Sequence, residues 1–406
     1  MSASPGRPLG SPGRDGGPLA GLTSTGSKRA AALFGDEYRD DPELPRLMLR
    51  SSGCRVWDAR GREYLDFIMA LGAVALGYGD PEVTAAAVRA VEAGGVGSLP
   101  PVIEGELAAE LCRLMPWVEQ VRFLKTGAEA MAAAVRLART VTGRELVLGC
   151  GYHGWLDWCH GPEAPARGVP AGTRALYGEL PFNEPERTRT LIRAAGDRLA
   201  AVVFEPVILA PPDPDWLRVL REETARVGAV LVCDEIKTVG RLALGGGCER
   251  FDIRPDLVVM AKAIANGFPL AAVGGRATVM AGVSRTWISS TLATEYVALA
   301  AARATLAALA SRAVPARLGV LGGRLMAGFD RLAARYPQHI RGVAGLPEMC
   351  CLLFRADAAG ARLAVEAARR GVLFKRSAYN FVSAAHTEED IDRALAVLEA
   401  GLAALG

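Results

Sequence analysis

Short apolar runs alternate with longer amphipathic segments through the middle of the chain. From about residue 105, segments with the helical period of apolar positions are separated by runs rich in Val, Leu and Ile. Strands of continuous apolar character between helices are typical of a parallel sheet that helices cover on both faces. The predicted strands are 121–124, 145–148, 199–204, 229–233 and 257–260, and the predicted helices around them are 105–114, 129–141, 186–196 and 215–227. The pattern therefore predicts an α/β domain with a mostly parallel central sheet.

The two ends of the chain have a different pattern. Apolar and polar residues alternate over residues 48–67 around the turn sequence Asp58-Ala-Arg-Gly61, which predicts a hairpin. A long Ala-rich helix at about 294–309 leads out of the α/β region. A helix, a strand at 349–354, a second helix, a short strand near Val372 and a closing helix at 388–404 follow it. This order predicts a smaller α+β lobe.

These patterns divide the chain into four parts. Residues 1–28 are rich in Gly, Pro and Ser, lack the apolar core of a signal peptide, and are expected to form a disordered tail. Residues 29–75 are expected to pack with the small domain, residues 76–311 to form the large domain, and residues 312–406 to form the small C-terminal domain.

Composition excludes several classes of partner. The net charge is +3 and no basic run is longer than two residues, so we expect no nucleic-acid partner. Apolar stretches are broken by Arg or Glu, so we expect no membrane span. The eight cysteines form no CxxC pair, which favours free thiols in a reducing compartment over disulfides or a metal site. The protein is thus expected to be cytoplasmic and to bind no metal.

Lysine is rare in this chain, and one lysine has a distinctive setting. Only 5 of the 47 basic residues Lys and Arg are lysines. Lys262 follows the predicted strand 257–260 after one residue, and it lies 28 positions beyond Asp234, which directly follows the predicted strand 229–233. Lysine can lose its proton and attack a carbonyl carbon, whereas arginine cannot, and burial among Ala and Ile would lower its pKa. Taken alone, Asp234 reads as a loop cap or an arginine partner, and only its pairing with Lys262 favours a cofactor role. Lys125 and Lys237 are alternative nucleophiles.

Two glycine-containing turns are candidate ligand contacts. Thr126, Gly127 and Ala128 lie where a helix begins, and free N–H groups at a helix N-terminus suit a phosphate. The alternative is an ordinary helix cap. Tyr152 and His153 stand between glycines after the strand 145–148, where an aromatic ring can approach a flat ligand. A surface loop anchored by its aromatic residue is the alternative there.

In this order and spacing, these segments resemble a known family. The stretch "DEIKTVGRLALGGGCERFDIRPDLVVMAKAIANGFPLAAVGGR" at 234–276, supported by "FLKTGAEAMAAAVRLAR", "TGRELVLGCGYHGW", "VVFEPV" and "SAAHTEEDI", is similar to class III aminotransferases. Among these, the glutamate-1-semialdehyde aminomutase branch is the most similar, and the resemblance covers about residues 45–395. It implies the fold type I of pyridoxal-phosphate enzymes, with the cofactor pyridoxal 5′-phosphate in the large domain.

The resemblance implies roles for the residues around the cofactor ring. Lys262 would form a Schiff base with the cofactor and then carry a proton between the substrate carbon and the cofactor. Asp234 would pair with the pyridine nitrogen and keep it protonated. Tyr152 would stack on one face of the ring, and Ile236 would pack on the other.

The resemblance also implies contacts to the cofactor phosphate. Gly127 and Ala128 would donate their N–H groups to it, with Thr126 as a further hydroxyl donor. Thr291 matches a threonine that reaches the phosphate from the neighbouring subunit, which implies a homodimer with shared active sites. Glu205 matches a glutamate near the cofactor.

Three departures from the family pattern affect the expected activity. Ala128 replaces a threonine of the phosphate turn, and "TEY" at 294–296 replaces a "GNP" ahead of the long helix. Asn380 stands in "SAYNF", where the aminomutase carries a glutamate. The last change weakens the case for aminomutase activity.

The predicted function is a pyridoxal-phosphate-dependent aminotransferase that works by a ping-pong mechanism on an amino donor and a keto acid or aldehyde. An aminomutase is the alternative within the family, and a non-catalytic, cofactor-binding regulatory protein is the alternative outside it. Arg376 and Arg241 are the candidates for binding a substrate carboxylate, because a guanidinium can hold it with two hydrogen bonds. An ordinary surface or interlobe arginine is the alternative for each.

Overall fold

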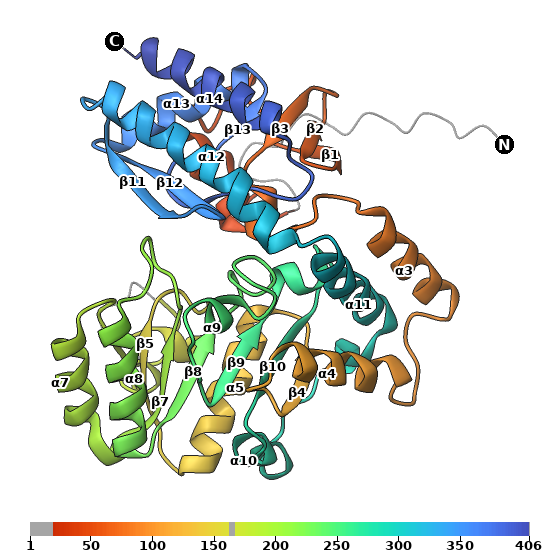
Figure 1. Ribbon diagram of the computed structural model, residues 1–406, viewed down its shortest axis with the longest axis vertical. Helices are drawn as coiled ribbons and strands as arrows, with labels where there is room; N and C mark the ends of the chain where they lie inside the picture. Colours follow the sequence, from red (N-terminus) through yellow and green to blue (C-terminus); the bar gives the residue numbers. More distant parts are fainter. Residues whose placement is uncertain (1–18, 162–166, 406) are drawn as a thin grey trace.

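The computed structural model describes residues 19–161 and 167–405 and shows two lobes (Figure 1). The lower lobe in this view holds the central sheet, and the upper lobe carries both the N-terminal strands and the C-terminal helices. The first 18 residues of the predicted tail lie outside the described residues, and the tail's last three residues form a short helix, η1 (Gly26–Lys28).

The large lobe is built on a seven-stranded sheet. Its strand order is β4-β10-β9-β8-β7-β5-β6. The strands are β4 (Gln120–Leu124), β5 (Leu146–Cys150), β6 (Tyr177–Glu179), β7 (Leu199–Phe204), β8 (Val230–Asp234), β9 (Leu257–Met260) and β10 (Ala271–Gly275). Only β10 runs antiparallel to its neighbours among the described strands of this sheet. The predicted α/β class with a mostly parallel sheet is confirmed.

Both faces of this sheet are buried, which explains its continuous apolar strands. In β8, Val230 and Val232 face one hydrophobic cluster, whereas Leu231 and Cys233 face another. Helix α5 (Gly127–Thr142) covers the first face, and α8 (Pro214–Val227) packs on β7 and β8. Alternate residues of a strand point to opposite faces, so a sheet covered on both sides needs apolar residues at every position.

The predicted helices around the sheet are confirmed, with ends set by local capping. They are α4 (Val102–Leu114), α5, α7 (Pro185–Ala195) and α8. Helix α5 begins with a capping box between Thr126 and Glu129 and ends at Gly143, which has a φ of 68°. The shorter or flanking helices are α1 (Ala30–Phe34), α2 (Met69–Gly72), α3 (Pro81–Glu92), α6 (Ala171–Arg174), α9 (Gly246–Arg250) and α10 (Ala277–Met280).

Two strands of the sheet are absent from the sequence prediction. β10 has the sequence AAVGG, and β6 has only three residues. Alanine and glycine have low β-propensity, so the local sequence of β10 gives little sign of a strand. A Cβ on Gly275 would lie 2.2 Å from the Asp256 carbonyl oxygen. Close packing against the neighbouring chain therefore requires glycine there.

The small lobe combines both ends of the chain. One sheet has the order β1-β2-β3-β13, from β1 (Met48–Ser52), β2 (Arg55–Asp58), β3 (Glu63–Asp66) and β13 (Val372–Leu373), and β13 runs parallel to β3. A second sheet joins β11 (Ile340–Leu346), β12 (Met349–Phe354) and β14 (Asn380–Phe381), and α12 (Val314–Arg335), α13 (Asp357–Arg369) and α14 (Glu388–Ala403) complete the lobe. The single hairpin predicted for residues 48–67 is wrong in one respect, because a second turn at Gly53 makes it a three-stranded meander.

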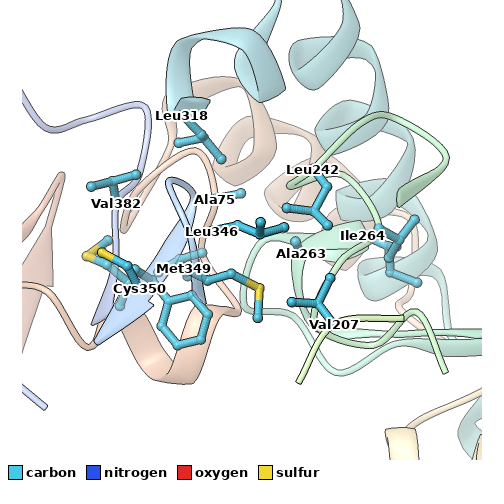
Figure 2. Close-up of a cluster of buried hydrophobic side chains, with 14 of the residues drawn as sticks. Ala75, Val207, Leu242, Ala263, Ile264, Leu318, Leu346, Met349, Cys350 and Val382 are labelled. Atoms are coloured by element: carbon cyan, nitrogen blue, oxygen red, sulfur yellow. The ribbon is translucent and has the colours of Figure 1, made fainter. Parts of the chain in front are cut away.

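An apolar cluster joins the lobes (Figure 2). Leu242 and Ile264 of the large lobe face Leu346 and Met349 of the small lobe, and all four are buried. The long helix α11 (Tyr296–Ser311) begins two residues later than predicted and leads into α12 across a 68° bend. Among the described helices, none is by itself long and apolar enough to cross a membrane, and this bent pair meets that test only by length and composition.

Candidate active site

Three polar side chains stand at one edge of the central sheet. Asp234 ends β8, Glu205 directly follows β7, and Lys262 follows β9 after one residue. β7, β8 and β9 are neighbouring parallel strands, with Phe204 opposite Cys233 and Asp234 opposite Val259. The carboxyl ends of parallel strands meet at the same edge, so residues 57 positions apart in the chain share one site.

Lys262 is held in a strained backbone conformation and a desolvated position. Its φ of 51° lies in the left-handed region, which a non-glycine residue adopts at a cost of about 1 kcal/mol or more. Burial and, second to it, the nearby cation of Lys237 lower the pKa of Lys262 to about 8, against the opposing pull of Asp234 and Glu205. The lowered pKa leaves a large neutral fraction of this amine at mildly alkaline pH.

Asp234 is buried and bonded on both oxygens. His153 Nδ1 lies 2.8 Å from Oδ2, and the Ile236 N–H donates to Oδ1 at 3.1 Å. A carboxylate only accepts, so Nδ1 is the protonated nitrogen of His153. Trp158 stacks on the imidazole at 6.2 Å between ring centroids. The sequence showed His153 beside Tyr152 but gave it no role; its bond to Asp234 spans 81 residues, and nothing local signals it.

Glu205 is paired with a lysine. Lys237 Nζ donates to Glu205 Oε2 at 2.8 Å and lies 5.1 Å from the centroid of the Tyr379 ring. Burial raises the pKa of Glu205, against the lowering effect of the Lys237 cation. The Tyr379 hydroxyl accepts the Leu209 N–H at 2.5 Å, so a small-lobe tyrosine closes over the loop after β7.

The N-terminus of α5 lies against Ile236. A Cβ on Gly127 would lie 2.7 Å from Ile236 Cδ1, so no larger residue fits there without displacing that side chain. The Glu129 N–H donates to Thr126 Oγ1 and the Ala130 N–H to the Thr126 carbonyl. The N–H groups of Gly127 and Ala128, which have no acceptor within a helix, are left for a ligand.

The Thr126 hydroxyl is engaged within the protein. It donates to Glu129 Oε2 at 3.1 Å while accepting the Glu129 N–H at 3.2 Å. This arrangement is the ordinary helix cap that the sequence left open as the alternative. A hydroxyl contact from Thr126 to a phosphate would first have to break the capping box.

Tyr152 and Thr291 lie on the surface of this single chain. Tyr152 is 72% exposed, and Thr291 opens the exposed short helix η7 (Thr291–Thr294). Trp287, four residues before Thr291, is 80% exposed. Large exposed apolar side chains near a site indicate a surface that another molecule covers.

Neither predicted arginine is free for a substrate. Arg241 is fully buried, and its guanidinium donates to the carbonyls of Glu348, Val382 and Gly72 at 2.9 to 3.2 Å. Three backbone segments are therefore joined by one side chain. This is the interlobe role that the sequence left as the alternative.

Arg376 is bound within the small lobe. Its guanidinium pairs with Asp357 at the start of α13 and donates to the Ala31 carbonyl at 3.5 Å. Asp357 is 80% exposed at its side chain, so the pair faces solvent on one side. The contacts tie the N-terminal segment to α13 and favour the alternative of an ordinary surface arginine.

The departures from the family pattern also find partners. Glu295 caps α11 by accepting the Val297 and Ala298 N–H groups, and Lys125 donates to its carboxylate at 2.5 Å. Asn380 is buried and bonds both the N–H and the carbonyl of Lys375. Asn380 therefore holds a small-lobe loop, and its side chain is an uncharged amide where the family's aminomutase has a glutamate.

The cysteines are free thiols, and two of them lie beside the buried carboxylate of Glu235. All eight cysteines are free. Cys233, Glu235 and Cys248 place one ligand atom each within 4.8 Å of one another. The Glu235 oxygens already accept from the Thr238 hydroxyl and from the N–H groups of Gly247 and Cys248. These bonds account for the burial of Glu235 without a metal.

A cavity of about 720 Å³ lies elsewhere, between the N-terminal segment and β2 and β3. Asp66 and Tyr78 line it, whereas Lys262 and Asp234 do not. The side chain of Asp66 accepts the Tyr78 hydroxyl at 2.7 Å. The cavity is therefore separate from the edge of the central sheet where the candidate site lies.

Comparisons with known proteins agree on one family. The family model described as class-III aminotransferase matches residues 38–400. A glutamate-1-semialdehyde 2,1-aminomutase of Thermomicrobium roseum is 35% identical over 402 residues, covering 90% of this chain and 93% of that protein. The solved internal aldimine form of the Sphingopyxis sp. MTA144 FumI protein superposes with a TM-score of 0.84 at 27% identity over 90% of each chain. An omega-transaminase of Sphaerobacter thermophilus gives 0.81 at 27% identity, over 93% of this chain and 98% of that one.

Proposed function

The chain belongs to the class III aminotransferase family, and we propose that it is an aminotransferase that moves an amino group from an amino donor to a keto acid or an aldehyde. Its fold is that of the fold type I pyridoxal-phosphate enzymes, and its cofactor is pyridoxal 5′-phosphate. One observation carries the proposal. An amine of lowered pKa, Lys262, stands beside the strand that ends in the buried carboxylate of Asp234.

The described residues fit this cofactor. The N–H groups of Gly127 and Ala128 at the start of α5 suit its phosphate, and the lack of space for a Cβ on Gly127 keeps the backbone within reach. Ile236, in contact distance of that glycine, offers an apolar surface to a flat ring. Bound in this site, the cofactor supplies an aldehyde that an amine can attack and a ring that accepts electrons from a substrate carbon.

Lys262 is proposed to hold the cofactor and then to move protons. Its neutral Nζ is the nucleophile that would hold the cofactor by its aldehyde. Once a substrate amine had taken that place, the same Nζ would be the group that accepts a proton from the substrate and gives it back. The lowered pKa of Lys262 suits both tasks, since a lysine that stayed charged could accept no proton.

Asp234 is proposed to pair with the ring nitrogen of the cofactor. A carboxylate there favours the protonated nitrogen and so strengthens the ring as an electron acceptor. The bond from His153 Nδ1 fixes the orientation of Asp234 and adds a donor to its charge. His153 is therefore a positioning residue that acts through Asp234.

Intermolecular transfer is favoured over the aminomutase reaction by Asn380. Both bonds of its side chain go to the Lys375 backbone, so it offers no acid or base at the place where the aminomutase carries a glutamate. The aminomutase remains the second candidate because a protein of that name is 35% identical to this chain. The test is incubation of the purified, cofactor-loaded protein with candidate amino donors. Release of a keto product without a second substrate bound supports the aminotransferase, and isomerisation in the absence of any acceptor supports the mutase.

A non-catalytic, cofactor-binding role is the candidate from another class. It predicts that the lysine-linked cofactor gives its absorbance band but that no donor removes it. Loss of this band on addition of an amino donor contradicts that role. If the purified protein shows no such band, or if Lys262→Ala leaves it unchanged, the aminotransferase proposal fails at its first step.

A homodimer with shared active sites is proposed as the working form, in the cytoplasm. The exposed Trp287 and Leu292 flank Thr291, and a second copy that covered them would bring Thr291 towards its neighbour's phosphate site. Sedimentation or light scattering measures the assembly. A monomer with full activity would contradict the shared site.

A further inference from the structure

We propose that Lys237 binds the carboxylate of the substrate, so that this site selects amino acids and keto acids over plain amines and aldehydes. The proposal rests on the aminotransferase function of the same site and names its substrate class. Its ground is the arrangement of charged side chains at the carboxyl edge of β7, β8 and β9.

Lys237 stands at the centre of the site. It lies one residue beyond Ile236, whose side chain contacts Gly127 at the proposed phosphate turn. Its Nζ is 2.8 Å from Glu205 Oε2, and its charge reaches the amine of Lys262. The side chain is 18% exposed, so a small ligand can reach it without unfolding the loop.

The ammonium of Lys237 keeps a donor for a ligand. An ammonium has three N–H donors and no acceptor. Glu205 accepts one, and the Tyr379 ring, 5.1 Å away at its centroid, offers its face to the cation. A point charge with three rotatable donors can serve Glu205 and a substrate carboxylate together.

The other cations considered for this task are occupied. Arg241 is fully buried and donates to three backbone carbonyls, and Arg376 pairs with Asp357. Lys125 pairs with Glu295, and Lys375 donates to the carbonyls of Ser27 and Ala32. Of Arg241 and Lys237, whose charges both act on Lys262, Arg241 is fully buried, whereas Lys237 is 18% exposed and keeps donors beyond the one that Glu205 accepts.

A substrate carboxylate needs a cation in this place. Asp234 and Glu205 are both buried acids at the same edge, and a third carboxylate would be repelled by them without a neighbouring positive charge. Burial disfavours the charged form of Glu205 and raises its pKa, which lessens the repulsion that a substrate carboxylate would meet beside Lys237.

The experiment compares donors that differ only in the carboxylate. Alanine is paired with isopropylamine, and 3-aminobutanoate with sec-butylamine, in which a methyl group replaces the carboxylate. In Lys237→Met, the ratio of kcat/KM for the acid to kcat/KM for the amine of each pair is expected to fall about 10- to 100-fold, mainly through the KM of the acid, because any change in the pKa of Lys262 affects both donors alike. Lys237→Arg, which keeps the charge, is expected to recover part of the loss.

A binding measurement needs no turnover. Butanoate and its neutral counterpart butanamide are titrated against the apoprotein, with thermal unfolding as the readout. The wild-type protein and Lys28→Met, which removes the same charge from an exposed lysine, are expected to prefer butanoate, and Lys237→Met is expected to lose that preference.

Three results overturn the proposal. The first is an equal loss of kcat/KM for the acid and the amine in Lys237→Met. The second is an unchanged preference of Lys237→Met for butanoate over butanamide. The third is a shift in the pH profile of the cofactor band in Lys237→Met while its preference for the acid is kept. The last would make Lys237 only a charge acting on Lys262. Each leaves the lysine-linked cofactor band and keto-acid release in place. Their absence from the wild-type protein is instead the failure of the proposed function.

Discussion

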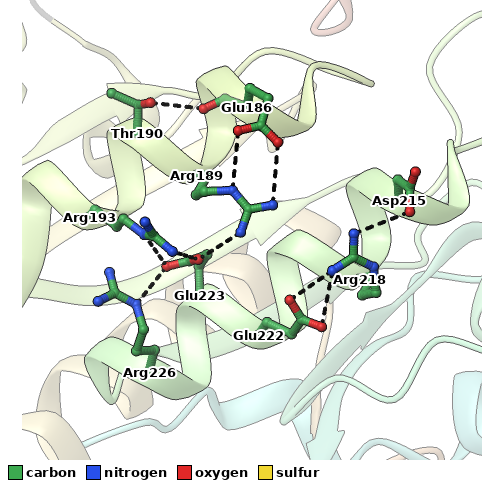
Figure 3. A network of polar contacts seen from close by, with 9 residues as sticks. All are labelled: Glu186, Arg189, Thr190, Arg193, Asp215, Arg218, Glu222, Glu223 and Arg226. Atoms are coloured by element: carbon green, nitrogen blue, oxygen red, sulfur yellow. Dashed lines mark hydrogen bonds and ion pairs between the residues drawn. The ribbon is translucent and has the colours of Figure 1, made fainter.

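Two buried glutamates of this protein have opposite pKa shifts. Glu223 on α8 is bonded by Arg193, Arg189 and Arg226 (Figure 3), and the hydrogen bond from Arg193 leads the effects that lower its pKa to about 2. Glu205 has one cationic partner, Lys237, and burial raises its pKa. On α7 and α8, three arginines donate to the single carboxylate of Glu223. At the sheet edge, one lysine donates to Glu205, and the carboxylate of Asp234 lies nearby.

The difference separates stability from chemistry. An acid held by several charge-assisted hydrogen bonds has its charge satisfied within the fold, so losing a partner costs stability and a ligand adds nothing. Charge that is buried with too few partners costs stability and is satisfied when a ligand arrives. The charges of Glu205, Asp234 and Lys262 at the sheet edge are buried with too few partners, whereas the charge of Glu223 on α8 is fully paired. Substitutions at the two places should therefore affect different measurements.

Lys262→Arg is expected to have the largest effect. Arginine keeps the positive charge but cannot lose its proton, so it can neither attack an aldehyde nor accept a proton from substrate. Turnover should fall below detection, while the far-ultraviolet circular dichroism and the unfolding midpoint stay close to those of the wild-type protein. A variant that keeps measurable turnover would remove Lys262 from the mechanism, and one that fails to fold would give this lysine a structural part.

Asp234→Ala is expected to reduce kcat about 100- to 1,000-fold, the order of loss when one preorganised charge is removed from an active site. His153 then loses its partner as well. The matched variant His153→Phe, which leaves the carboxylate in place, should cost less. Equal losses in the two variants would mean that positioning by His153 accounts for the whole effect of Asp234.

The pH dependence of cofactor loading tests the lowered pKa of Lys262. Below its pKa of about 8 the neutral fraction of the amine rises about tenfold per pH unit, so the rate at which apoprotein takes up pyridoxal phosphate should rise and level off near pH 8. Lys237→Met removes a neighbouring cation, which raises the pKa of Lys262 and moves the plateau to higher pH. A free alkyl amine used as the control should keep gaining up to its own, higher pKa. A plateau at that higher pH in the protein would mean that Lys262 is not desolvated.

Glu223→Gln is expected to have the smallest effect on function and a moderate one on stability. It should lower the free energy of unfolding by about 1–3 kcal/mol at pH 7, because charge-assisted bonds to the arginines are lost, and leave kcat unchanged. The pKa of Glu223 is lowered, so its contribution is complete above the unfolded value near 4.5 and disappears as pH falls towards 2. The gap between wild type and variant should close over that range in denaturant titrations.

The exposed pair Arg218 and Glu222 on the same helix provides the matched control. Exposed ion pairs are screened by water and add little to stability. Arg218→Ala should therefore leave the unfolding midpoint unchanged. If Glu223→Gln lowers the stability no more than Arg218→Ala does, the ion pairs of Glu223 are screened by water in the same way as the exposed pair. Glu223 would then not differ from Glu205 in the way described.

Local sequence sufficed for most of the central sheet and for the two residues at the centre of the site. Strands β7, β8 and β9 are runs of apolar residues buried on both faces, and their ends are marked by Glu205, Asp234 and the residue before Lys262. The position of a residue at a strand end is a short-range property, so the sequence places Asp234 and Lys262 near a common edge as soon as the strands are parallel. The sequence did not predict β10, because its Ala and Gly residues have low β-propensity and form a strand only through pairing with β4 and β9.

The amino-acid sequence by itself determined the α/β class, the family resemblance and the lysine that can lose its proton. Tertiary structure alone decided which charges meet. From the sequence, Arg241 and Arg376 are as able to bind a carboxylate as any other arginine. In the folded protein, Arg241 is bonded to backbone carbonyls and Arg376 to Asp357. Lys237 is bonded to Glu205, which lies 32 residues away in the chain, and His153 is bonded to Asp234, which lies 81 residues away. Hydrogen bonds and ion pairs act over a few ångströms, and the distance along the chain carries no information about which groups the fold brings that close.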